Sequence, residues 1–105
     1  MDPEVEKVEA TMRLIGATWI PAIMFVLINQ GTSRFSEIKR AIPDVSQRML
    51  TKQLRDLEAA GLVHREYHQT IPPKVEYSAT AEGQSLKPIY VAICAWAAEH
   101  PAARR

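Results

Sequence analysis

The sequence has only one cysteine, Cys94, among its 105 residues, so an internal disulfide is excluded. A lone cysteine is typical of proteins from reducing compartments, and we therefore expect a cytoplasmic location. We expect no secretory signal, because the first residues, 1–4, are acidic and lack an apolar segment. The longest apolar run, residues 19–28, is too short for a bilayer, and Pro21 interrupts it. A membrane-spanning helix is therefore not predicted.

The chain also lacks a strong charge of either sign. Its 13 lysines and arginines nearly balance 12 acidic residues, and its formal net charge is +1. If the protein binds nucleic acid, its positive charge must therefore gather on one face.

Signatures of enzymes and metal sites are missing as well. We find no Gly-rich phosphate loop, no paired carboxylates and no general base beside Cys94, so we expect neither catalysis nor a cofactor. His64 and His68 would lie about 13 Å apart in a strand, too far to share a metal ion. Cys94 has apolar neighbours, and we predict that it is a buried structural residue.

The apolar residues that are present predict helices in the first third of the chain. Their spacing predicts a helix over residues 4–15, which Gly16 would end in a left-handed conformation. A second helix is predicted over residues 20–29, with Pro21 in its first turn. Because this segment is apolar on every side, it needs burial all round. A monomer of this length provides little material for that, which is a first indication of a dimer.

Two shorter helices are predicted in the middle of the chain, over residues 35–42 and 47–60. Ser46 is a suitable N-cap for the second of them. The second helix would pack on the core through a stripe of Leu50, Leu54 and Leu57. Together the two helices predict a helix-turn-helix over about residues 35–60.

The apolar pattern then changes to a period of two residues. Residues 63–68 and 74–79 indicate two strands around a proline-containing loop, which is a hairpin. A last helix is predicted over residues 81–99, capped by Thr80 and kinked at Pro88.

This order of elements, a helix-turn-helix followed directly by a hairpin, is that of a winged helix-turn-helix. We therefore predict a single domain over residues 1–105, mainly α with a small β-hairpin wing (α+β). The wing would span about residues 63–79.

The helix over residues 47–60 has a polar face opposite its leucines. Arginine can bind a guanine edge through two hydrogen bonds, lysine can bind phosphates, and threonine can contact a thymine methyl. Most charged helix faces are merely solvated, so the prediction depends on the position of this helix between a turn and a hairpin. We predict that this face reads DNA bases through Gln47, Arg48, Thr51 and Lys52.

Other polar residues on the same side are predicted to hold the DNA backbone. Arg34 and Ser36 lie near the N-terminus of the preceding helix, where free N–H groups favour phosphate. Lys39 and Arg40 lie further along the same helix. The hairpin adds basic residues near its tip, while we expect the acidic residues mostly at the two ends of the chain. The predicted backbone contacts are Arg34, Ser36, Lys39, Arg40, Ser46, Arg55, Arg65 and Lys74.

A set of motifs runs from about Val8 to His100. It comprises Glu9-Ala10-Thr11, Leu14-Ile15-Gly16, Trp19, Arg34-Phe35-Ser36-Glu37-Ile38, Ser46-Gln47-Arg48-Met49-Leu50-Thr51, Leu54-Arg55-Asp56-Leu57-Glu58-Ala59-Ala60-Gly61-Leu62-Val63 and Pro72-Pro73-Lys74-Val75-Glu76-Tyr77. In combination these motifs resemble the HxlR family of bacterial winged-helix transcriptional regulators. The resemblance implies a recognition helix in the major groove, beginning at Gln47, and a hairpin that touches the flanking backbone or minor groove.

The resemblance also implies a homodimer built mainly from the first and last helices, about residues 4–15 and 81–99. The side chains predicted at that interface are Val5, Val8, Met12, Ile89, Tyr90, Ile93 and Trp96. Trp19, Tyr90 and Trp96 could instead line a ligand pocket, but aromatic residues at helical spacing are more typical of a core or a dimer contact.

The chain departs from the family pattern at two places. Glu6-Lys7 stand where several members carry a Cys-Pro pair that senses electrophiles or oxidants, so that mechanism is not carried over. Thr18 stands where members usually have a lysine. Sensing by a small molecule at the dimer interface, sensing by Cys94 and no sensing remain alternatives.

We therefore predict a bacterial DNA-binding transcriptional regulator that acts as a homodimer on a pseudo-palindromic operator. Its partners would be double-stranded DNA and a second copy of itself. The alternative is a winged-helix protein-interaction module without DNA binding, which the modest net charge favours. Because both would share a fold, only a measurement of DNA binding separates them.

Overall fold

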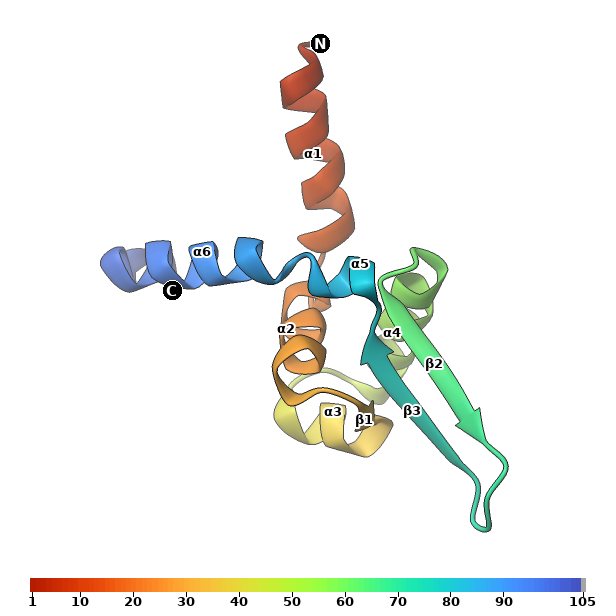
Figure 1. The fold of residues 1–105 in the computed structure, drawn as a ribbon. Coiled ribbons are helices and arrows are strands. Elements are labelled where there is room, and N and C mark those ends of the chain that lie inside the picture. Colours follow the sequence, from red (N-terminus) through yellow and green to blue (C-terminus); the bar gives the residue numbers. More distant parts are fainter. Residues whose placement is uncertain (105) are drawn as a thin grey trace.

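The computed structural model describes residues 1–104, with the side chains up to residue 102, and has the predicted winged helix-turn-helix fold (Figure 1). Its elements are α1 (Pro3–Ile15), α2 (Ile20–Gln30), β1 (Ser33–Arg34), α3 (Phe35–Ala41), α4 (Gln47–Ala59), β2 (Val63–His68), β3 (Lys74–Ala79), α5 (Ala81–Gln84), α6 (Lys87–Glu99) and a short 3-10 helix (Pro101–Arg104). The mainly α architecture with a small β wing is confirmed.

The wing belongs to a three-stranded antiparallel sheet in the order β1-β3-β2. The hairpin of β2 and β3 has the bounds that the sequence predicts, and Arg65 lies opposite Tyr77 in its register. The third strand, β1, was not predicted, because two residues are too few to show a period. Ser33 of β1 is buried and pairs with Tyr77 in the register of β1 and β3. The Ser33 hydroxyl donates to the carbonyl oxygen of Gly31 (2.9 Å).

The core lies between α2, the helix-turn-helix and the base of the sheet. Three α2 side chains, Ile23, Met24 and Leu27, are fully buried there. The predicted leucine stripe of α4, Leu50, Leu54 and Leu57, is buried as well. Within the single chain α2 is not buried all round, because Phe25 on its outer face is 41% exposed.

The turn between α1 and α2 differs from the prediction in its backbone. Gly16 has φ −103° and ψ 1°, so α1 does not end in a left-handed glycine. The left-handed residue is Trp19, with φ 72°, immediately before α2. A bulky side chain seldom adopts this conformation, so the surrounding packing of Trp19 against the core must hold it.

The segment 81–99 forms two helices rather than one kinked helix. Pro88 has no N–H to continue a helix from α5, and it occupies the first turn of α6 instead. Thr80 does cap α5, as predicted: its hydroxyl accepts from the N–H of Gly83 (3.0 Å) and donates to the carbonyl oxygen of Gly61 (2.7 Å).

The outer helices α1 and α6 extend away from the body in different directions (Figure 1). The side chains of α1 are exposed except for Ile15. The exposed apolar residues of these helices include Val5, Val8, Met12, Ile89, Ile93 and Trp96.

Two predictions for α6 need correction. Tyr90 is only 5% exposed and belongs to the core of its own chain, since α6 packs its first turn against α2, so it offers little surface to a second subunit. Cys94 is exposed rather than buried, because it lies in the part of α6 that extends beyond the core.

Within residues 1–104, no single helix is long and apolar enough to cross a membrane. The helices α1 and α2 meet that measure only as a pair, which is bent by 74°.

Candidate nucleic-acid interface

The local sequence around α4 fixes both its start and its attachment to the core. The Ser46 hydroxyl caps the helix by accepting from the N–H of Met49 (3.0 Å), as predicted. Gln53 is buried, and its side-chain amide donates to the carbonyl oxygen of Thr18 (3.0 Å), in the turn that joins α1 and α2. The buried leucines and this hydrogen bond therefore determine which face of α4 remains outside.

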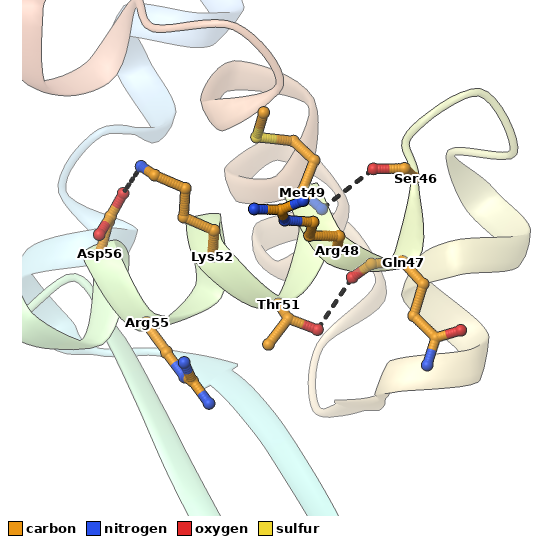
Figure 2. A pocket seen from close by; sticks show the side chains of 8 residues that line it. All are labelled: Ser46, Gln47, Arg48, Met49, Thr51, Lys52, Arg55 and Asp56. Atoms are coloured by element: carbon orange, nitrogen blue, oxygen red, sulfur yellow. Dashed lines mark hydrogen bonds and ion pairs between the residues drawn. The ribbon is translucent and has the colours of Figure 1, made fainter.

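The outer face of α4 is polar and surrounds an open pocket (Figure 2). The residues that line this pocket are Ser46, Gln47, Arg48, Met49, Thr51, Lys52, Arg55 and Asp56. The structure thus brings all four predicted base-reading residues together with two of the predicted backbone contacts. Met49 and Asp56 complete the surface, and neither was predicted from the sequence.

Local hydrogen bonds determine what each of these side chains can offer. The Thr51 hydroxyl donates to the carbonyl oxygen of Gln47 (2.9 Å), so the methyl group of Thr51 is its free end. Lys52 Nζ lies 2.8 Å from Asp56 Oδ2, in an exposed ion pair across one helical turn. Arg48 is exposed, and no carboxylate among the described residues lies within 4.0 Å of its guanidinium group.

The predicted DNA-backbone contacts at and within the preceding helix, α3, differ in their hydrogen bonding and exposure. Lys39 Nζ donates to the carbonyl oxygen of Pro43 (2.7 Å), so this lysine is partly engaged at rest. Arg34 and Ser36 are exposed at the start of α3, and the N–H of Arg34 donates to Glu37 Oε1 (2.8 Å). Arg40 is exposed beside Glu37 in a shallow depression.

The prediction that the acidic residues lie mostly at the two ends of the chain, away from the face with the predicted DNA contacts, is wrong. Asp56 and Glu58 lie on α4 and Glu37 lies on α3, each among the predicted DNA contacts. The spacing of Lys52 and Asp56 by four residues was the sequence signal that could have revealed their ion pair.

The wing places Arg65 differently from the prediction. Arg65 lies near the start of β2, where it lines a groove with Arg55 and Tyr77, and not near the tip of the hairpin. Lys74 does lie at the tip, opposite His68 in the strand register. His64 Nε2 lies 2.8 Å from Glu66 Oε2.

Comparison with known proteins identifies sequences and structures with the same organisation. A model of the HxlR-like helix-turn-helix family matches residues 14–104. The HTH-type transcriptional regulator YkvN of Bacillus subtilis, itself uncharacterized, is 49% identical over 88 residues, which are 84% of this chain and 74% of YkvN.

Solved structures agree with these sequence matches. The crystal structure of the HTH-type regulator YtcD superposes with a TM-score of 0.85 at 44% identity, covering 90% of this chain and 96% of that one. The redox regulator HypR in its oxidized form superposes with a TM-score of 0.82 at 45% identity, again over 90% of this chain and 96% of that one.

Proposed function

This chain belongs to the HxlR-like helix-turn-helix family, and from that premise we propose that it regulates transcription as a homodimer on a pseudo-palindromic operator. Its relatives are HTH-type transcriptional regulators with winged-helix structures, so the chain is a DNA-binding regulator and not an enzyme. Beyond this, we propose the kind of operator, the residues that read it and the homodimer that binds it. We also propose that residues 1–105 form one domain.

The polar outer face of α4 is the observation that carries this proposal. In helix-turn-helix proteins the N-terminal residues of the second helix contact base edges in the major groove. Here the first two turns of that helix expose the arginine and lysine side chains of Arg48 and Lys52, together with Gln47 and the Thr51 methyl group. Arg48 would bind a guanine edge and the Thr51 methyl a thymine methyl, while Gln47 suits an adenine edge.

The residues around this helix would hold the phosphates on either side. Phosphate contacts set the position of a protein on the duplex, and base contacts set the preferred sequence. The proposed phosphate contacts are Arg34, Ser36, Lys39, Arg40, Ser46, Arg55, Arg65 and Lys74. Lys39 and Lys52 would exchange their internal partners for DNA.

The exposed apolar side chains of α1 and α6 support the homodimer. Val8 and Met12 of α1 are 61% and 52% exposed, and Ile93 and Trp96 of α6 are 51% and 56% exposed. Large apolar residues concentrated on two helices are typical of a surface that a partner covers. A two-fold dimer would place two α4 helices in successive major grooves, about 34 Å apart.

Selection of bound fragments from sheared genomic DNA tests this proposal. The expected result is enrichment of a short inverted repeat whose two halves are separated by about one helical turn. Recovery of fragments without a shared sequence would contradict the proposal.

An Arg48→Ala variant in the same selection tests the assignment of base reading. We expect the inverted repeat to remain but to lose discrimination at one position in each half, worth about 1–3 kcal/mol. An unchanged repeat would contradict a base-reading role for Arg48.

A further inference from the structure

The groove between α4 and the wing brings together two arginines from different elements. Arg55 enters it from α4 and Arg65 from β2, and Thr51, Leu54, Glu58 and Tyr77 complete its lining. No carboxylate among the described residues lies within 4.0 Å of either guanidinium group. The two cations therefore share one hollow without a direct counter-ion, an arrangement that an anion between them would stabilise.

The groove is preformed by the fold. Arg65 and Tyr77 are directly opposite in the strand register, and cross-strand neighbours on one face contact each other. Tyr77 is half-buried and packs against the core, so it restricts the conformations open to Arg65. Thr51 and Arg55 are one helical turn apart on α4, which places both on the side that faces the wing.

The position of Arg55 along α4 matches the wall of a major groove. It lies eight residues after Gln47, about 12 Å along the helix axis. The major groove is itself about 12 Å wide, so a helix whose first turn contacts bases brings this residue to the bordering phosphates.

We propose that Arg55 and Arg65 bind one and the same backbone phosphate, as a clamp closed by α4 and the wing; this rests on the proposed function. Guanidinium groups suit this ligand because each can donate two parallel hydrogen bonds to phosphate oxygens. The clamp fixes the angle between the recognition helix and the wing on DNA. Glu58 in the same groove opposes the phosphate and reduces its affinity.

The dependence of DNA affinity on salt distinguishes a shared phosphate from two separate ones. Each phosphate neutralised contributes about 0.9 to the slope of log affinity against log salt. Arg55→Ala, Arg65→Ala and the double variant are compared on one duplex that contains the selected inverted repeat. Because the proposed homodimer carries one clamp in each half-site, we expect the double variant to lose about 1.8 of slope in total, and a loss of about 3.6 would overturn the clamp.

Replacing single phosphates by neutral methylphosphonates locates the contact. We expect one position per half-site at which a methylphosphonate weakens DNA binding by the unaltered protein about tenfold. The same methylphosphonate should have little further effect on DNA binding by either arginine variant. Arg40→Ala is the matched control, because it removes a proposed contact on α3 and should leave that position fully sensitive. Different positions for Arg55 and Arg65 would overturn the clamp.

A Glu58→Gln variant adds an independent reading of the same groove. Glu58→Gln should raise the affinity for the duplex at low salt. This increase should disappear when the phosphate located above is replaced by a neutral methylphosphonate. If the unaltered protein binds the duplex but these couplings are absent, only the clamp fails. If the unaltered protein shows no affinity for DNA, the proposed function fails together with it.

Discussion

At the scale of single residues, the ion pair of Lys52 and Asp56 bears most directly on DNA binding. Its orientation is the less favourable one in a helix, because the acid lies on the C-terminal side of the base. Both side chains are more than half exposed, so the pair contributes little to stability. We interpret Asp56 instead as a residue that neutralises Lys52 until DNA replaces it.

We predict that Asp56→Asn strengthens binding to DNA of any sequence. In the proposed homodimer the change removes a negative charge from each face that would meet DNA and frees both copies of Lys52, so the salt slope should steepen by about two units. Titrations of operator and scrambled duplexes over a range of salt measure this. Glu9→Gln, which removes an exposed acid from α1, serves as the charge-matched control. Weaker binding to the operator alone would show that Asp56 itself contacts a base.

Tyr90 provides a second test at this scale. Its hydroxyl is buried without a hydrogen-bond partner among the described residues, and burial raises the pKa of this hydroxyl above its ordinary value. The raised pKa disfavours the folded state only as the pH rises past the ordinary value near 10, where the unfolded chain releases the proton first.

We predict that Tyr90→Phe increases the free energy of unfolding by about 1 kcal/mol, because it removes an unsatisfied polar group from the core. Urea unfolding at neutral and alkaline pH measures this, and the difference between variant and parent should grow above about pH 10. Tyr67→Phe, at an exposed position, is the control. A loss of stability that accompanies weaker dimerisation would contradict the placement of Tyr90 in its own core.

At the scale of elements, the proposed recognition helix α4 depends on its cap. Ser46 satisfies the N–H of Met49 and fixes the residue at which the helix begins. The first helical residue, Gln47, and its neighbour Arg48 are both proposed to read bases, so the position of the cap determines their position on DNA.

We predict that Ser46→Ala lowers the free energy of unfolding by about 1 kcal/mol. Ser36→Ala on α3, where the serine hydroxyl is not the N-cap and makes no hydrogen bond to a described residue, is the matched control and should change stability by less than about 0.5 kcal/mol. Urea unfolding of both variants at neutral pH measures the difference. Equal stability of the two variants would contradict the importance of the cap.

The sequence predicts those elements whose local signals agree with their tertiary surroundings. Ser46 and the leucine stripe predict α4, and alternation predicts β2 and β3 with their observed bounds. The break between α5 and α6 was missed because a proline permits either a kink or a new helix, and packing decides between them. The left-handed Trp19 has no local signal at all, since only the closure of the turn around the core imposes it.

The part of the candidate site that lies on α4 was predictable from the sequence, but the groove formed between α4 and the wing was not. Spacing alone identifies the outward residues of α4, from Gln47 to Arg55. The groove that joins Arg55 to Arg65 was not predictable, because it depends on where the hairpin packs against the helix. The exposure of Cys94 was missed for a similar reason, since apolar neighbours in sequence do not reveal where the core ends.

At the scale of the whole molecule, the outer helices leave apolar surface that the body does not cover. The chain has extents of 51 × 31 × 23 Å, and α1 and α6 project from its body, as does the hairpin of β2 and β3 (Figure 1). A hydrophobic residue on each of these helices, such as Met12 or Ile93, gains burial only if a second molecule packs against it.

We predict that Ile93→Glu disrupts the proposed homodimer. In a two-fold interface each substitution occurs twice, and each buried, unpaired carboxylate costs at least about 2 kcal/mol. Sedimentation equilibrium should therefore show a monomer at concentrations where the parent is a dimer. Ile71→Glu, at the fully exposed tip of the wing, is the control and should remain dimeric. A dimeric Ile93→Glu protein would contradict the assignment of α6 to the interface.

The central claim is that this molecule reads DNA sequence through α4. The most direct test is the affinity of the purified protein for a duplex with the selected inverted repeat and for a scrambled duplex of equal length, both at physiological salt. We predict at least about a thousandfold preference for the repeat. Equal affinities for the two duplexes would contradict the claim.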